Sequence, residues 1–163
     1  MKQIIGTCLA AGLLFTSCHA SRKATQGGVV ATKERNQIVS TARKYIGAPY
    51  RYGGTSPTDG FDCSGFVQYV FALHGVQLPR TTGQLYGTGK KVSLEDARVA
   101  DLILFTGSNA NGPVGHVGII THPAGRETAF IHVGSSKGGG VVMASLSNTY
   151  FSKRFLKVVD VMR

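Results

Sequence analysis

The sequence predicts an α+β fold in which helices come first and an antiparallel sheet follows. Apolar residues recur at three- to four-residue spacing only before about residue 74. Beyond residue 100, short runs rich in β-branched and aromatic residues are separated by Gly, Asn and Pro. Because these runs do not alternate with helices, we expect their strands to pair antiparallel. The 163 residues, 42% of them apolar, suffice for one domain with its own core.

The chain begins with a segment typical of an export signal. A positive start containing Lys2 precedes an apolar run over residues 4–15, which is shorter than the ~20 residues that span a membrane. Cys18 follows shortly after, as in bacterial lipoprotein signals, where cleavage precedes a cysteine that becomes lipidated. We therefore expect removal of residues 1–17 and a lipid on Cys18. The alternative is ordinary cleavage after Ala20, and both predict export.

Two helices are expected after this segment. Residues 18–33 lack periodicity and are rich in Ser, Thr, Gly and basic residues, which predicts a flexible tether. The apolar spacing predicts a first helix over residues 34–47. A Gly- and Pro-rich loop follows at 50–60, and a second helix is expected from Cys63 to about His74, with Asp62 as its N-cap. Residues 78–100 are expected to be mostly irregular.

The second half of the chain is expected to form the sheet. Its strand-like runs lie at residues 102–106, 114–121, 128–133, 141–146 and 156–162. The sequence therefore predicts a sheet of about five strands.

The odd cysteine count leaves one thiol without a partner. Of Cys8, Cys18 and Cys63, the first is discarded with the signal and the second is expected to carry lipid. An unpaired Cys63 in a compartment that favours disulfides needs a reason. At the predicted start of a helix, free N–H groups and the positive dipole end favour the thiolate, as a nucleophile requires. The simpler interpretation is that Cys63 is a small buried hydrophobic residue with no chemical role.

Two histidines lie within strand-like runs, where burying an ionisable side chain is costly: His116 and His132. A hairpin turning about Ala124 would place them directly opposite each other, with Cβ atoms roughly 4.5–5.5 Å apart. One imidazole could then take the proton of the Cys63 thiol while the other fixes its orientation. A one-residue slip in register would break this pairing.

Other interpretations of these residues stay open. Each histidine taken alone is more typical of a hydrogen-bonded core residue. A metal site built from Cys63, His116 and His132 is a third possibility, although the sequence lacks the short-spaced ligand pairs that are common in zinc sites.

The net charge of +10 points to an anionic partner, such as a wall polymer, a membrane surface or nucleic acid. The basic residues are scattered along the chain, without a basic stripe or aromatic platforms. This pattern, together with export, argues against nucleic-acid binding.

The sequence resembles the NlpC-type family of bacterial cell-wall endopeptidases, which are papain-like cysteine peptidases, over about residues 38–160. Within that family it is similar to short single-domain murein endopeptidase lipoproteins. Ala100 stands where the family usually has Gly. The resemblance rests on ordered motifs at residues 47–54 (GAPYRYGG), 60–66 (GFDCSGF), 78–82 (LPRTT), 100–105 (ADLILF), 116–119 (HVGI) and 130–132 (FIH).

The resemblance implies a papain-like fold and a Cys-His-His mechanism. It makes Cys63 the nucleophile, His116 the general base and His132 the orienting residue. Tyr50 matches a tyrosine that helps to hold the oxyanion, and Asp62 and Ser64 match positions that shape the peptide groove. The chemistry requires no metal and no cofactor, so we expect none.

The resemblance also implies a domain plan and a location. We expect a lipoprotein signal at 1–17, a lipidated tether at 18–33 and a peptidase domain at 34–163. The expected partners are murein peptides and a membrane reached through Cys18, with the protein a monomer in the cell envelope, on the outer membrane facing the periplasm. The alternatives are an amidase or acyltransferase of related fold and a wall-binding module without catalysis.

Overall fold

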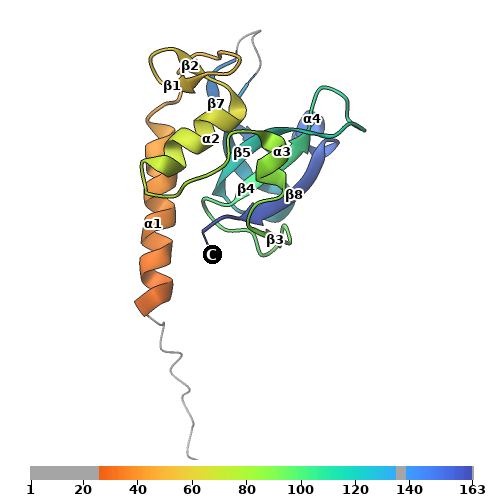
Figure 1. The fold of residues 1–163 in the computed structure, drawn as a ribbon. Helices are drawn as coiled ribbons and strands as arrows, with labels where there is room; N and C mark the ends of the chain where they lie inside the picture. Colours follow the sequence, from red (N-terminus) through yellow and green to blue (C-terminus); the bar gives the residue numbers. More distant parts are fainter. Residues whose placement is uncertain (1–25, 135–138, 163) are drawn as a thin grey trace, which may run out of the picture.

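The computed structural model describes residues 26–134 and 139–162 (Figure 1). The expected signal peptide, the expected lipid site at Cys18 and the tether before residue 26 lie outside the described residues. The helices are α1 (Gln26–Arg43), α2 (Cys63–Ala72), α3 (Thr82–Tyr86) and α4 (Thr149–Ser152), with a 3-10 turn η1 (Gly125–Glu127). The strands are β1 (Thr55–Ser56), β2 (Gly60–Phe61), β3 (Lys90–Val92), β4 (Leu102–Thr106), β5 (Val114–His122), β6 (Ala129–Val133), β7 (Val141–Ser145) and β8 (Phe155–Asp160).

The main sheet among the described residues has six strands in the order β3-β8-β4-β5-β6-β7. Every neighbouring pair is antiparallel, which confirms the predicted α+β class. Five of the strands, β4 to β8, lie where the sequence predicted them. The sixth, β3, lies in the segment that we expected to be irregular, because a three-residue strand containing Lys90 and Lys91 carries no readable alternation.

Helix α1 begins at Gln26, earlier than the predicted start at Glu34, so residues 26–33 of the expected tether are helical. Ala31, Lys33 and Glu34 are good helix formers, and they extend the helix away from its packed part. Arg35 ties this stretch to the sheet, because its buried guanidinium is paired with Asp101 and Asp160. The apolar periodicity that we used begins only at Ile38, which is why it missed the first turns.

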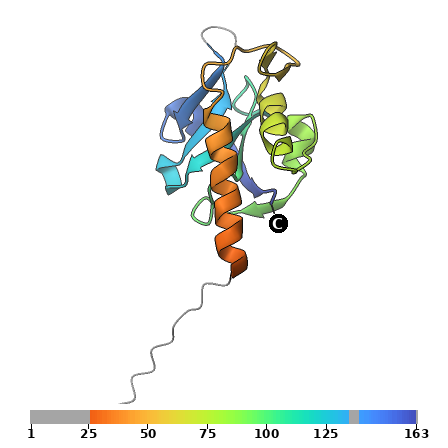
Figure 2. The ribbon, with the colours of Figure 1, turned by 90° about the vertical axis from the view of Figure 1, so that its left-hand side faces the viewer.

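The sheet is apolar on both faces, and the helices α1 and α2 cover one of them (Figure 2). Alternate residues of each strand point to opposite faces, so Leu102 and Leu104 pack under the helices while Ile103 and Phe105 face the other side. Strand β4 is buried along its whole length. The start of α2 thus lies against a rigid, two-sided core.

Ala100, just before β4, has a φ of 65°. This left-handed conformation favours glycine, which accounts for the Gly usual in the resembled family. Among residues 26–134 and 139–162, no helix combines the length and apolar character needed to cross a bilayer.

Candidate active site

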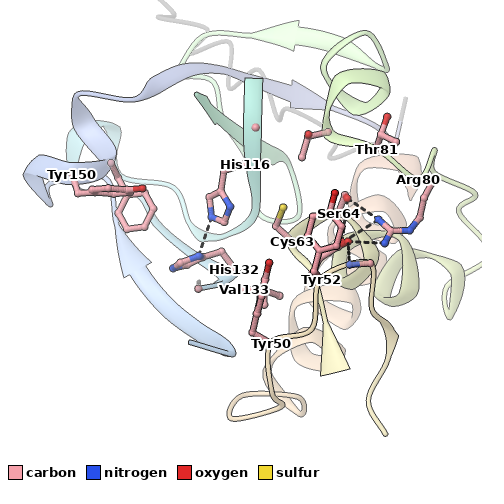
Figure 3. A pocket seen from close by; sticks show the side chains of 16 residues that line it. Tyr50, Tyr52, Cys63, Ser64, Arg80, Thr81, His116, His132, Val133 and Tyr150 are labelled. Atoms are coloured by element: carbon pink, nitrogen blue, oxygen red, sulfur yellow. Dashed lines mark hydrogen bonds and ion pairs between the residues drawn. The ribbon is translucent and has the colours of Figure 1, made fainter. Parts of the chain in front are cut away.

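A groove of about 750 Å³ lies between the start of α2 and the sheet (Figure 3). Its walls come from the loop before β1, the first turn of α2, the segment at residues 80–82, strands β5 and β6, and α4. The structure brings all the sequence-predicted residues of the described region to this groove: Tyr50, Asp62, Cys63, Ser64, His116 and His132.

Cys63 is the first residue of α2, as predicted, and it is half-buried. Asp62 caps the helix, and its side chain accepts a hydrogen bond of 2.7 Å from the Gly65 N–H. The N–H groups of Cys63 and Ser64 belong to the first turn and have no acceptor within the helix. They are therefore available to an oxygen atom placed beside the Cys63 sulfur.

The first turn of α2 packs closely against the loop before β1, and the contact leaves no room for a side chain at Gly65. A Cβ added at Gly65 would lie 2.1 Å from the Gly54 carbonyl oxygen. The Asp62 N–H also donates to this oxygen, at 3.0 Å. The glycines of the GG and CSG motifs thus fix where the thiol lies.

Asp62, Ser64 and Arg80 form a hydrogen-bonded cluster on one side of the groove. Arg80 donates from Nη1 and Nη2 to the two Asp62 oxygens at 3.0 and 2.6 Å, and from Nη1 to Ser64 Oγ at 2.9 Å. Burial favours protonation of Asp62, but the bonds from Arg80 and Gly65 outweigh it and hold the pKa of Asp62 below its usual value. The sequence motif contains Arg80, but its role cannot be read from the sequence, because its partners are brought to it by the tertiary fold.

His116 and His132 lie on the same face of the sheet, and His116 Nε2 is 3.0 Å from His132 Nδ1. The predicted register was wrong by two residues: His132 lies opposite Gly118, and His116 is its diagonal neighbour. The connection from β5 to β6 contains the turn η1 and a bulge near Thr121, so the hairpin does not turn about Ala124. A shift of two residues keeps each side chain on its predicted face.

Gly118 allows the two imidazoles to meet. A Cβ at this position would lie 2.7 Å from Phe130 Cδ2, 3.0 Å from the Ile131 carbonyl oxygen and 3.4 Å from His132 Cβ. Because no side chain stands opposite His132 on β5, its ring is free to reach along the sheet to His116. We did not assign this role from the sequence, since it depends on the observed register.

The ring of His116 points toward Cys63 in Figure 3, and the Tyr50 side chain extends into the same space. Since His116 Nε2 is engaged with His132, its Nδ1 is left to exchange a proton with the thiol. A bridge between Tyr50 and Phe61 holds the Tyr50 backbone beside the start of α2.

Burial has the largest effect on the charge states of Cys63, His116 and His132. It lowers the pKa of His116 to about 3, with a further contribution from His132, and it lowers the pKa of His132 to about 4. Burial, followed by the Asp62 carboxylate, raises the pKa of the Cys63 thiol, against the opposing backbone N–H groups of Ser64, Val117 and Cys63. The N–H groups at the helix start favour the thiolate, as expected, but burial and the Asp62 carboxylate outweigh them in the free protein.

The metal-site interpretation finds no support in this geometry. Within the described parts of the chain, no three His, Cys, Asp or Glu residues are placed to bind one ion together. At 3.0 Å, the facing nitrogens of His116 and His132 are at hydrogen-bond distance from each other, which leaves no space for an ion between them.

The arrangement places a thiol, an imidazole and a second, orienting imidazole in sequence along one groove. This is the order of groups that general-base activation of a nucleophile needs. The roles that the sequence suggested for Cys63, His116, His132 and Tyr50 are compatible with it. Asp62 and Ser64 have the additional structural task of holding Arg80 and the start of α2.

Comparison with known proteins gives consistent matches. The model of the NlpC/P60 family matches residues 47–160. The bifunctional muramidase/DL-endopeptidase CwlT of Bacillus subtilis is 45% identical over 82 residues, or 50% of this chain and 25% of that protein. A probable endopeptidase of Haemophilus influenzae is 44% identical over 117 residues, or 71% of this chain and 67% of that protein. This chain therefore spans about a quarter of the length of CwlT.

A solved structure shows the same fold. The crystal structure of a Staphylococcus aureus protein of the NLP/P60 family, described as similar to lipoprotein, superposes with a TM-score of 0.69 and 33% sequence identity. The match covers 80% of this chain and 42% of that one. It confirms the fold that the resemblance implied.

Proposed function

This chain belongs to the NlpC/P60 family, and from that premise we propose that it is a cysteine-type peptidoglycan endopeptidase. The names of its relatives support an endopeptidase activity. The observation that carries the proposal is the convergence of Cys63, His116 and His132 on one open groove.

In the first step, the Cys63 sulfur attacks the carbonyl carbon of a peptide bond. The thiol proton moves to His116 Nδ1 as the carbon–sulfur bond forms, because the thiol and the imidazole are both neutral beforehand. In this mechanism the His116 Nε2–H donates a hydrogen bond to His132 Nδ1, which keeps His116 Nδ1 directed at the sulfur.

The tetrahedral intermediate carries its negative charge on the former carbonyl oxygen. The Cys63 N–H and the Tyr50 hydroxyl are the donors that we assign to this oxygen. His116 then returns its proton to the leaving amine as the carbon–nitrogen bond breaks, which leaves a thioester on Cys63. Water, deprotonated by His116, attacks the thioester and releases the carboxylate product and the free thiol.

We further propose that the bond cut joins a D-residue to an L-residue within a stem peptide, such as D-glutamyl–diaminopimelate. The name of CwlT, a DL-endopeptidase, supports this choice over the D-alanyl cross-link between stems. The Asp62–Arg80 cluster lies beside Cys63 and presents charged groups to the polar peptide on one side of the scissile bond.

The proposed place of action is the cell envelope. Export through residues 1–17 and lipidation of Cys18 would anchor the enzyme to a membrane, which we propose to be the outer membrane facing the periplasm. The lipoprotein description of the S. aureus structure supports an anchor. The net charge of +10 suits work on an anionic wall.

Defined muropeptides test the proposal. Purified protein is incubated with uncross-linked stem peptides and with cross-linked dimers, and the products are identified by mass spectrometry. Cleavage of the D-glutamyl–diaminopimelate bond in both substrates is the expected result. Cleavage confined to the cross-link would overturn the choice of bond, and no cleavage of either substrate would overturn the endopeptidase assignment.

A further inference from the structure

Three phenylalanine rings pack against the His116–His132 pair. Phe105 and Phe130, both buried in the sheet, lie with ring centroids 6.0 Å from His116 and 5.5 Å from His132. Phe151 comes from α4 and contacts both imidazoles. Its centroid is 6.3 Å from His116, nearly parallel at 26°, and 5.1 Å from His132, edge-on at 76°.

The short helix that carries Phe151 is fixed at both ends. The Asn148 side chain accepts a bond from the Tyr150 N–H at its start. At its end, the Thr106 N–H of β4 donates to the Arg154 carbonyl, and the Arg154 guanidinium donates to the Ser108 carbonyl oxygen. The Phe151 ring also packs on Phe105 and Phe130, at 5.2 and 5.0 Å. Its position over the histidines is therefore set by the fold.

Phe151 is half-buried and lines the groove, whereas Phe105 and Phe130 are fully enclosed. It therefore covers part of the histidine pair at the edge of the groove, which His116 and His132 also line. We propose that Phe151 is a positioning residue, which shields the His116–His132 hydrogen bond from water and so keeps the His116 ring directed at Cys63.

The physical reason is competition by water. A hydrogen bond in a region of low dielectric is stronger than one exposed to water, and water next to the pair would both compete for Nε2 and solvate a charged imidazolium. The lowered pKa values of both histidines are consistent with this shielding. The other titratable groups around the groove are Tyr50, Tyr52, Cys63, Tyr150 and the mutually paired Asp62 and Arg80. The catalytic consequence of the shielding rests on the proposed function, whereas the titration of the histidines does not.

Substitution of Phe151 combined with NMR of the histidine rings tests the inference. Phe151→Ala removes the ring that shields the histidine pair, and Phe151→Leu replaces it with a smaller apolar side chain. Phe155→Leu is the matched control, because Phe155 packs on the same Phe105 ring, at 6.4 Å, and lies in the same apolar cluster. The ring nitrogen signals of His116 and His132 are followed from pH 8 to about pH 2, a range that includes the wild-type midpoints of about 3 and about 4. The kcat and KM values are measured on a cleaved muropeptide.

We expect Phe151→Ala to raise the titration midpoints of both histidines by at least about one pH unit and to lower kcat at least about tenfold. Phe151→Leu should fall between this variant and the wild type, and Phe155→Leu should match the wild type. Unmoved midpoints in the Phe151 variants overturn the inference, even if kcat falls, because the loss would then come from groove contacts. If the wild type cleaves no muropeptide, the proposed function fails while the titration still decides the role of Phe151.

Discussion

Cys63 is under two opposing influences at the residue scale. The start of α2 supplies N–H groups that favour the thiolate, while burial and the Asp62 carboxylate favour the thiol. Burial also keeps His116 and His132 uncharged. The resting site at neutral pH is therefore a thiol beside a neutral imidazole, and proton transfer accompanies attack on the substrate.

This charge state predicts the alkylation of Cys63. The thiolate is the reactive form, and burial raises the pKa of Cys63 above its ordinary value. The rate of reaction with iodoacetamide, followed on the Cys63 peptide by mass spectrometry, should thus rise only at alkaline pH. A high plateau between pH 5 and pH 8 would reveal a thiolate–imidazolium pair instead.

The histidines predict how stability depends on pH. Their folded pKa values of about 3 and about 4 lie below the unfolded value of ~6.5, so the unfolded chain binds more protons at acidic pH. The free energy of unfolding should therefore be insensitive to them above pH 6.5. Below it, stability should decline by up to about 1.4 kcal/mol per pH unit for each histidine.

Urea unfolding at pH 7.5, 6.5 and 5.5 measures this decline. His132→Gln removes one of the two groups, so its stability should fall less steeply between pH 7.5 and pH 5.5 than that of the wild type. An equally steep fall in both proteins would contradict the assignment of a low pKa to His132.

At the scale of elements, the placement of α2 depends on the contact between Gly65 and Gly54. Gly65→Ala would force a Cβ to within 2.1 Å of a backbone oxygen, so the start of α2 must move and take Cys63 with it. We expect a loss of about 1–3 kcal/mol in the free energy of unfolding, together with a lower kcat.

Gly83→Ala is the control for this substitution. Gly83 lies in α3, and a Cβ there would meet no atom within 4 Å. The free energy of unfolding of Gly83→Ala should stay within about 0.5 kcal/mol of the wild type, and the kcat of this variant should be unchanged. Equal behaviour of the two variants would show that the Gly65 contact does not position the helix.

Elements with a strong local pattern were predictable from the sequence. The start of α2 carries its own cap in Asp62, and β4 to β8 carry β-branched residues bounded by turn residues. The short helix α3 was missed, although its capping box of Thr81 and Gln84 can be read from the sequence. The short helix α4 has too few residues for any periodicity.

The details of the site depended on tertiary geometry. The hairpin register shifted by two residues because η1 and a bulge lie between the strands, yet the period of two kept both histidines on one face. The roles of Arg80, Gly118 and Phe151 follow from contacts between distant segments. No local pattern reveals such contacts.

At the scale of the whole molecule, Arg35 joins α1 to two neighbouring strands of the main sheet, β4 and β8. Its guanidinium is paired with Asp101, just before β4, and with Asp160, at the end of β8. Arg98 also pairs with Asp160. Arg35 and the two carboxylates that it connects are all buried, so the pairs are desolvated and depend on each other.

Removal of Arg35 should therefore be costly. Arg35→Met leaves the buried Asp101 carboxylate without its guanidinium, and we expect a loss of about 3–5 kcal/mol in the free energy of unfolding. Arg43→Met, at an exposed position of the same helix, should change stability by less than about 0.5 kcal/mol. Chemical denaturation measures the free energy of unfolding of both variants. A similarly small change in both would contradict the role of Arg35 in holding α1 to the sheet.

The whole molecule thus places one thiol, at the start of a helix, against a pair of histidines held by a sheet. We propose that this thiol hydrolyses peptide bonds in peptidoglycan. The most direct test compares the wild type with Cys63→Ala in the release of peptides from purified peptidoglycan, with thermal unfolding measured on both. We predict that the variant unfolds like the wild type and releases no peptide. A folded Cys63→Ala protein that releases peptides at the wild-type rate would contradict the claim.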